Sequence, residues 1–422
     1  MNRSIAPPIK LVEKINLKDA EKASFSDNIN AYLVKGGKKN IIKIEIAFKA
    51  GRLYEPQKLV AQLTARMLNE GTENYTAKAL AEKIDYYGAT INTKAGMDHV
   101  KMTIFTLKKF LPQVMDLAIE ILSKPTFPEK EFSTIIKNSI QKLEVNLEKT
   151  TYLASAKFYE SIFTAKHPYG YTVGVEDYKA LNRDLLEAFY KEKYSCSPIN
   201  VYISGKYEEH DVAIIKTALT SLKVESQTVN IDIEPPAYKA QNHTIKKEDA
   251  LQAALRIGMR TIGKNHPDRH TLSILNTVFG GYFGSRLMSN IREEKGYTYG
   301  IYSTISSYKQ QACFLISTEV DVNVCDAAVK EIFNEISRLK NELIAQEELD
   351  LVKNYILGTM LQQLDGPFKI SATLKALYDA DLDSQYIHDY VEKVKSVSAL
   401  ELQECAKQYF IEESFTTVIA RN

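Results

Sequence analysis

The sequence has no surplus of charge of either sign. It contains 54 basic and 53 acidic residues, which gives a net charge of +1 at pH 7. No basic tract and no acidic tail occur in it, so nothing indicates a nucleic acid partner. The chain also lacks a run of roughly 18 apolar residues, the length that a membrane-spanning helix needs. We therefore expect neither nucleic acid binding nor a membrane span.

The chain is poor in cysteine and has no recognisable secretory signal. Its four cysteines, Cys196, Cys313, Cys325 and Cys405, show no C-x-x-C spacing. We expect buried free thiols, and neither a disulfide framework nor a zinc–thiolate site. Residues 1–8 lack the apolar core and the cleavage site of a signal peptide. A cytoplasmic protein is the default expectation, and a periplasmic one fits if a signal peptide has been removed.

A pattern of strands and helices occurs twice along the chain. In the first half, a strand is predicted over 41–48, a helix over 59–68 and a strand over 90–93. In the second half, a strand is predicted over 251–259 and a helix begins at Pro267. The equivalent of the 90–93 strand then follows, predicted over 297–307.

Each half continues with a further strand and two helices. The predicted ranges are 101–106, 110–124 and 129–149 in the first half, and 312–320, 324–340 and 346–363 in the second, with a last strand at 415–420. Strands that alternate with helices predict an α/β sandwich with a mixed sheet in each half. Pro235 and Pro236 place a linker within 224–247. We therefore divide the chain into domains at 1–230 and 240–422.

One helix of the first half resembles a zinc-binding helix that has lost its ligands. Residues 62–72 read QLTARMLNEGT. This frame resembles the pitrilysin and mitochondrial-processing-peptidase family of inverzincins, in which His-x-x-Glu-His runs into Met-x-x-x-Gly-Thr. Aligned in this way, the two family histidines fall on Gln62 and Arg66, and the glutamate falls on Ala65. The resemblance extends from about residue 41 to about residue 420.

The chemistry of these replacements argues against a metal site. Two histidines at i and i+4 bind one zinc ion, and the glutamate between them activates the bound water. Gln62 is a poor zinc ligand, Ala65 cannot act as a base, and Arg66 carries a fixed positive charge. The family's third ligand falls near Gln141 and Lys142, with Glu144 as the nearest acid. The resemblance therefore implies no metal and no other cofactor in this chain.

A second family feature is present in the second half. Residues 280–287 read GGYFGSRL and residues 291–299 read IREEKGYTY. These resemble the family segments Gly-Gly-x-x-x-Ser-Arg-Leu and Arg-x-x-x-Gly-x-x-Tyr. The resemblance implies two domains that face each other across a cavity, with Arg292 and Tyr299 approaching a substrate peptide. A guanidinium and a phenol suit this role, because both can donate to the oxygen that becomes negative during hydrolysis.

Structural roles for the same residues remain open. Arg292 could pair with Glu293 or Glu294 at a helix end, and Tyr299 could be a half-buried aromatic residue of a strand. The glycines of the segment permit a positive φ or a close approach of the backbone; they are Gly280, Gly281 and Gly284. Their spacing is neither that of a phosphate loop nor that of a dinucleotide fingerprint.

Histidines at three places in the sequence are candidates for metal binding or for structural roles. His266 and His270 have the spacing of metal ligands, but Pro267 predicts that the helix begins after His266, which leaves that residue off the helical face. A solvated pair is the simpler interpretation. We expect structural roles for His99 and for His167 as well.

Two functions from different classes fit the sequence. In the first, the chain is a non-catalytic subunit of a heterodimeric zinc peptidase, and it supplies Arg292 and Tyr299 to the zinc site of a homologous partner. In the second, it is a structural or peptide-binding subunit without any proteolytic role. An independently active metallopeptidase would require ligands that the sequence does not offer.

Overall fold

The computed structural model describes residues 12, 15–195, 199–222, 237–309 and 311–422. Cys196 and most of the predicted linker lie outside these ranges. Strand β7 (Asn242–Lys246) forms near the end of that predicted linker, so this part of it has regular structure. The three other cysteines are free and buried, as the sequence predicts.

Among the described residues, six strands form the first sheet, in the order β1-β2-β6-β3-β5-β4. All neighbours pair antiparallel except β2 and β6, which are parallel. The strands are β1 (Glu21–Ser26), β2 (Ile29–Lys35), β3 (Ile41–Phe48), β4 (Thr90–Ala95), β5 (Val100–Leu107) and β6 (Ile199–Gly205).

The second sheet contains five strands in the described part of the chain, in the order β7-β11-β8-β10-β9. Here β7 and β11 are the parallel pair, so the order repeats that of the first sheet without β1. The remaining strands are β8 (Gln252–Thr261), β9 (Ile301–Ser307), β10 (Ala312–Asp321) and β11 (Thr416–Arg421). The predicted fold class, an α/β chain with two similar mixed sheets covered by helices, is confirmed.

Helices cover both sheets. Those of the first half are α1 (Val60–Met67), α2 (Ala77–Tyr86), α3 (Leu111–Ser123), α4 (Glu129–Leu147), α5 (Thr150–Phe163), α6 (Val175–Lys179), α7 (Arg183–Ser195) and α8 (Glu209–Thr220). Those of the second half are α9 (Arg269–Gly280), α10 (Cys325–Asn341), α11 (Gln346–Gln363), α12 (Pro367–Tyr378), α13 (Gln385–Ser396) and α14 (Ala399–Tyr409).

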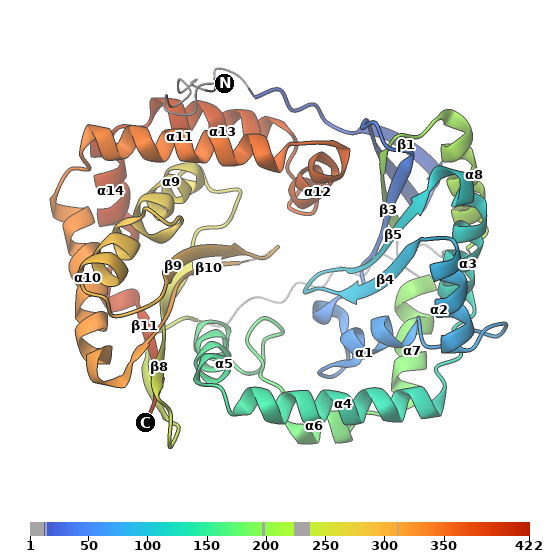
Figure 1. Cartoon of the computed structure of the whole chain (residues 1–422), viewed down its shortest axis with the longest axis horizontal. Helices are drawn as coiled ribbons and strands as arrows, with labels where there is room; N and C mark the ends of the chain where they lie inside the picture. The colour runs from blue at the N-terminus through green and yellow to red at the C-terminus, as the bar shows by residue number, and fades with distance from the viewer. Residues whose placement is uncertain (1–11, 13–14, 196–198, 223–236, 310) are drawn as a thin grey trace, which may run out of the picture.

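Each half of the chain lends one helix to the sheet of the other half. Helix α5 packs on β8 and β11, and α12 packs on β2 and β6. Figure 1 shows the result, a ring-like arrangement in which α4 runs along one side and α11 and α13 along the opposite side. The α5 contact combines the buried rings of Phe158 and Phe163 with a hydrogen bond of 2.8 Å from Arg260 of β8 to the carbonyl of Ile162. The exchange therefore ties the two halves together at two places.

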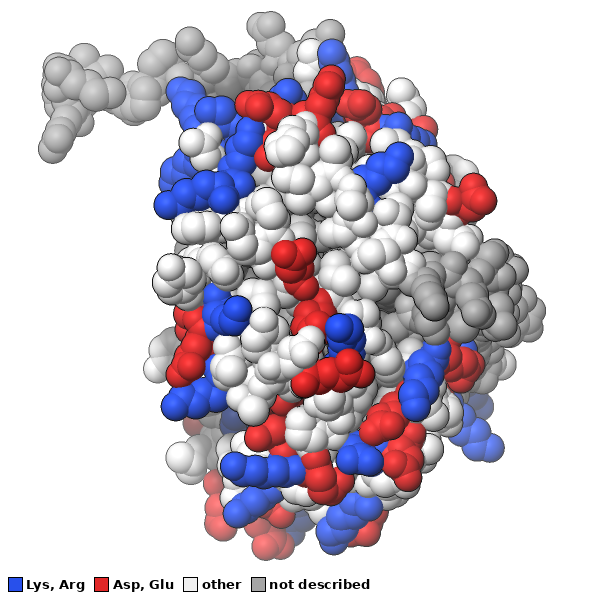
Figure 2. Space-filling view, turned by 90° about the vertical axis from the view of Figure 1, so that its right-hand side faces the viewer, with Lys and Arg blue, Asp and Glu red and all other residues white. Residues whose placement is uncertain are grey.

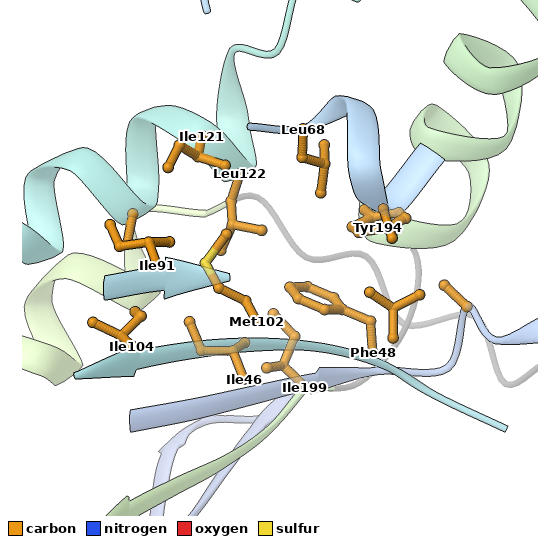
Figure 3. Packing of buried hydrophobic residues seen from close by; sticks show 14 of the residues in the cluster. Ile46, Phe48, Leu68, Ile91, Met102, Ile104, Ile121, Leu122, Tyr194 and Ile199 are labelled. Carbon is orange, nitrogen blue, oxygen red and sulfur yellow. The ribbon is translucent and has the colours of Figure 1, made fainter. Parts of the chain in front are cut away.

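The core of the first half lies between its sheet and helices α1, α3 and α7. Figure 3 shows Ile46 and Phe48 of β3 beneath Leu68, at the end of α1, and Ile121 of α3. Isoleucines alternate along β3, and this alternation presents one apolar face to the helices, as the sequence predicts.

The other face of β3 is buried as well, because α12 covers this side of the sheet. Lys43 and Glu45 lie there, and their side chains form an ion pair of 2.7 Å. Burial lowers the pKa of Lys101 on the adjacent strand, and Lys375 of α12 lowers it further. Charged side chains also lie in the contact of α5 with the second sheet, where Arg256 of β8 donates to the hydroxyl of Ser155 at 3.0 Å.

The outer surface of the first half carries both signs of charge. In Figure 2, acidic and basic side chains are mixed over the lower part of the face seen there, its upper middle is largely uncharged, and basic side chains gather at its upper left. Among the helices of the described ranges, none combines the length and the apolar character needed to cross a bilayer.

Candidate functional site: a lost metal helix and a braced arginine

Helix α1 presents two of its three motif positions to solvent. Gln62 and Arg66 are exposed and lie one turn apart, whereas Ala65 is fully buried in the core. The partly buried carboxylate of Glu55 accepts a hydrogen bond of 3.0 Å from the backbone N–H of Ala61 and so occupies the start of the helix. Burial raises the pKa of Glu55.

Arg66 lies where the motif would require its second histidine, and it binds helix α4 instead. Its guanidinium donates to the hydroxyl of Ser139 at 3.4 Å. Glu70, near the end of α1, has a pKa that burial raises and that Arg66 lowers in part. A permanent cation held at this position excludes a dication from the same place.

The remaining candidates for the third ligand do not gather at this point. Gln141, Lys142 and Glu144 are all exposed on α4. Within the described ranges, no three side chains of His, Cys, Asp or Glu come together in a way that could hold a metal ion. The residues present on α1 and α4 do not fit zinc. No catalytic step of this chain can therefore use a metal ion bound by these two helices.

The histidines at 266 and 270 face different surroundings. Helix α9 begins at Arg269, two residues later than predicted, with Asp268 before it. His266 is exposed, and its Nδ1 accepts a hydrogen bond of 3.1 Å from the backbone N–H of Asp268. The ring of His270 packs 4.5 Å from that of Tyr386, and burial lowers the pKa of His270.

His167 has a packing role in the described structure, and His99 is partly buried. The ring of His167 is buried beside Tyr169, and its Nδ1 accepts a hydrogen bond of 3.1 Å from the backbone N–H of that residue. Burial lowers the pKa of His99.

Close packing explains the first glycine of the glycine-rich segment. A Cβ atom on Gly280 would lie 2.5 Å from the hydroxyl and 2.8 Å from the backbone nitrogen of Ser303, on β9. None of Gly280, Gly281 and Gly284 has a positive φ, so close approach rather than backbone conformation requires glycine at 280. The end of α9 is thereby held against the sheet.

Helix α11 braces the same segment at two points. The guanidinium of Arg286 donates two hydrogen bonds of 2.8 Å to the carboxylate of Glu348. The ring of Tyr282 packs on the ring of Tyr355, with centroids 4.7 Å apart. Sequence reasoning missed both contacts.

Arg292 follows in a π-helical turn, Met288–Glu294. The centre of its guanidinium lies 4.5 Å from the centroid of the Phe283 ring. Glu293 is 3.8 Å away, beyond hydrogen-bond distance. Among the described residues, none accepts a hydrogen bond from this guanidinium, and about a third of the side chain is exposed. The expected ion pair with Glu293 is therefore loose.

Tyr299 lies outside the strand in which it was predicted. Strand β9 begins at Ile301, and the side chain of Tyr299 is 93% exposed. The hydroxyl of the preceding Thr298 donates to the carbonyl of Glu319 at 2.7 Å and fixes the backbone there. The interpretation of Tyr299 as a half-buried strand residue is wrong, and no direct contact joins it to Arg292 in the described part of the chain.

Comparison with known proteins identifies the family of this chain. The sequence matches two protein-family models. The model described as "Insulinase (Peptidase family M16)" matches residues 31–166, and the model described as "Peptidase M16 inactive domain" matches residues 180–356. The chain belongs to peptidase family M16. The first match contains the helix that lacks zinc ligands, and the second contains the glycine-rich segment and Arg292.

Relatives in this family carry names of two kinds. An "uncharacterized zinc protease" of Rickettsia bellii is 23% identical over 390 residues, which cover 91% of this chain and 93% of the relative. The "non-peptidase homolog YmxG" of Helicobacter pylori is 24% identical over 400 residues, which cover 90% and 88%. A crystal structure titled peptidase M16 inactive domain, from Pseudomonas fluorescens, has a TM-score of 0.87 at 22% identity and covers 95% of this chain and 98% of that one.

Proposed function

We propose that this chain is the non-catalytic subunit of a heterodimeric zinc peptidase of family M16. In this proposal, Arg292 and Tyr299 bind a peptide whose scissile bond lies at the zinc site of a homologous partner subunit. The chain itself binds no cofactor, and the expected location is the cytoplasm, or the periplasm if a signal peptide precedes the chain.

One contrast carries the proposal. Helix α1 retains its place in the fold but holds Gln62 and Arg66 where a metal site needs histidines. The segment that leads to Arg292 is fastened by an ion pair and by two ring contacts, and yet it ends in a guanidinium without a hydrogen-bond acceptor among the described residues. A protein with a purely structural role has no need of a guanidinium that a ring contact holds in place and that stays open to solvent, where it can donate to a ligand.

The role of Arg292 follows from the charge that develops during hydrolysis. The partner's zinc supplies the activated water, and attack on the peptide carbonyl leaves negative charge on its oxygen. A guanidinium stays protonated at any physiological pH and can donate to that oxygen. Removal of one such donor typically costs about 100-fold or more in kcat.

The role of Tyr299 follows from its exposure. Its side chain contributes little to the fold because it is almost fully exposed, whereas its backbone is held by the bonds of Thr298. A phenol presented in this way can donate to a peptide backbone or to the developing oxyanion.

The experiment uses a zinc-bearing homologue of family M16 as the partner and a quenched fluorescent peptide as the substrate. We expect no turnover by this chain alone and turnover after mixing. Arg292→Ala and Tyr299→Phe in this chain should lower kcat of the mixture without changing its assembly. Stoichiometric zinc or EDTA-sensitive turnover in the isolated chain would overturn the proposal.

The second candidate is a structural or peptide-binding subunit with no part in proteolysis. The name of the Helicobacter pylori relative, a non-peptidase homolog, favours it. It predicts that a complex of the two subunits cleaves peptides at the same rate with and without the Arg292→Ala substitution.

A further inference from the structure

The π-helical turn that carries Arg292 is tied to helix α10 by a buried hydrogen bond. The amide nitrogen of Asn290 donates to the carboxylate of Glu335 at 2.7 Å and to that of Glu331 at 3.3 Å. Glu335 is only 1% exposed, so the shorter of the two bonds lies in the interior of the second half. We call Asn290 and Glu335 the buried pair.

The packing of α10 does not explain a carboxylate at position 335. The other buried residues of this helix are apolar, and they include Ile332, Ile336 and Leu339. Removing a carboxylate from water costs free energy, and an apolar side chain of similar volume is often at least as stable in such a place. Arg338 also binds Glu335, at 2.8 Å, but the arginine itself is half exposed. The contact with Asn290, rather than the packing of the core, therefore accounts for Glu335.

Asn290 is also the residue at which the turn closes. Its carbonyl accepts a hydrogen bond of 3.0 Å from the backbone N–H of Lys295, and the carbonyl of Ile291 accepts one of 3.0 Å from the N–H of Tyr297. The side chain of Ile291 is fully buried. The two residues that precede Arg292 are therefore fixed through both backbone and side chain. A π-helical turn is rare in proteins and often occurs at a functional site.

The side chains of Asn290 and Arg292 point to different sides of this turn. Residues two apart in a helical turn do not share a face. Asn290 binds α10, whereas the guanidinium of Arg292 lies 4.5 Å from the centroid of the Phe283 ring and about a third of its side chain is exposed. A movement of the turn relative to α10 would therefore displace the guanidinium as well.

We propose that Asn290 and Glu335 are positioning residues for Arg292. This inference rests on the proposed function and adds to it. The bond between the two side chains sets the place of the turn against α10, and this puts the guanidinium where it can donate to the peptide carbonyl at the partner's zinc site. The Phe283 ring restricts the guanidinium itself, and the buried pair restricts the backbone that carries it. A displacement of about 1 Å in such a donor can cost about 100-fold in rate.

The test uses this chain mixed with a zinc-bearing homologue of family M16, with a quenched fluorescent peptide as the substrate. Glu335→Met replaces the carboxylate by an apolar side chain of similar length that offers no oxygen, and Asn290→Leu removes the donor. We expect each to lower kcat by about 10- to 100-fold with little change in KM. Glu335→Gln keeps an acceptor oxygen and should restore most of the lost kcat.

A second background shows whether the buried pair acts through Arg292. In a chain that already carries Arg292→Ala, Glu335→Met should lower kcat by less than about twofold more, because the group that it positions is absent. A pair with a merely structural role would lower kcat by the same factor in both backgrounds. The matched control is Arg338→Met, which removes the other partner of Glu335 and should leave kcat of the parent protein unchanged.

Hydrogen exchange of the isolated full chain is a measurement that needs no partner subunit. The backbone amides of Lys295 and Tyr297 should exchange faster in Glu335→Met and in Asn290→Leu, because the turn has lost its bond to α10. Arg338→Met should leave the exchange of these amides unchanged. Circular dichroism and thermal unfolding verify that each variant is folded. The two Glu335 variants decide the test if Asn290→Leu does not fold.

The outcomes distinguish this inference from the function on which it rests. If the mixture has no turnover, or if Arg292→Ala leaves its kcat unchanged, the proposed function fails and the positioning role fails with it. If Arg292→Ala lowers kcat but Glu335→Met does not, the positioning inference alone is wrong. Equal losses of kcat in the two backgrounds, with faster exchange in the turn, would show that the buried pair has only a structural role.

Discussion

Arg286 and Glu348 join the glycine-rich segment to helix α11 through two parallel hydrogen bonds of 2.8 Å. The planar guanidinium matches the carboxylate in this geometry, and both side chains are largely withdrawn from solvent. The pair lies between the body of the second half and the loop that carries Phe283. It therefore links the stability of the fold to the position of the donor.

The first prediction concerns this pair. Glu348→Ala leaves the Arg286 guanidinium partly buried without its partner, and we expect the free energy of unfolding to fall by about 1–3 kcal/mol. The control is Glu342→Ala, which removes an exposed partner of Arg338 and should cost under about 0.5 kcal/mol. Urea unfolding can be followed by tyrosine fluorescence, because the chain has no tryptophan. Equal losses in the two variants would contradict the prediction.

Two glycines should respond to alanine with opposite signs. A methyl group on Gly280 would meet Ser303 at 2.5 Å, so Gly280→Ala should destabilise the protein by about 1–3 kcal/mol. Gly358 lies inside α11 with no heavy atom within 4 Å of the added carbon. Gly358→Ala should therefore stabilise the protein by about 0.5–1 kcal/mol, because alanine loses less entropy in a helix. Thermal unfolding midpoints that move in the same direction for both would overturn this account.

The sequence predicts the bounds of two regular elements to the residue. The strand at Ile41–Phe48 and the helix at Gln346–Gln363 have the bounds predicted for them. The strand predicted from residue 297 starts instead at Ile301, because the hydroxyl of Thr298 bonds to the carbonyls of Glu319 and Gly300 where a strand would pair through its backbone. Such a local side-chain competition leaves no periodic signal.

The exchange of α5 and α12 between the halves could not be predicted from the pattern. Phe158 and Ile162 form an apolar stripe in α5, but a stripe does not specify which sheet it covers. For the candidate site, the motif frame locates Gln62, Arg66 and Arg292. The contacts that hold the glycine-rich segment join Arg286 and Tyr282 to helix α11, which is distant in sequence, and these contacts appear only in three dimensions.

A pH dependence is expected from Glu55. Burial raises its pKa above the ordinary value of 4.5, so the folded state binds a proton more tightly than the unfolded state does. Its contribution to stability is therefore greatest below pH 4.5 and is lost as pH rises through the folded pKa. Glu55→Gln cannot ionise and escapes this loss, so its stability relative to the parent protein should improve as pH rises from 4.5.

Urea midpoints of both proteins, measured across this pH range, provide the test. Glu176→Gln, at an exposed position of α6, is the control for the removal of a surface carboxylate. A constant difference between Glu55→Gln and the parent protein would show that Glu55 has no shifted titration.

The last prediction concerns metal. Arg66, at the position of a motif histidine, donates to Ser139, and the described residues of α1 and α4 offer no set of ligands. The purified chain should therefore contain far less than one zinc ion per molecule by atomic absorption, and neither EDTA nor added zinc should move its unfolding midpoint.

The double substitution Gln62→His and Arg66→His supplies two imidazoles on one helical face and removes the opposing charge. We expect it to bind zinc weakly and to gain a zinc-dependent rise in the unfolding midpoint, because binding to the folded state stabilises that state. Loss of stability of the parent protein in EDTA would contradict the prediction that helix α1 binds no metal. A zinc response confined to the double variant would identify Arg66 and Gln62 as the residues that keep the site without metal.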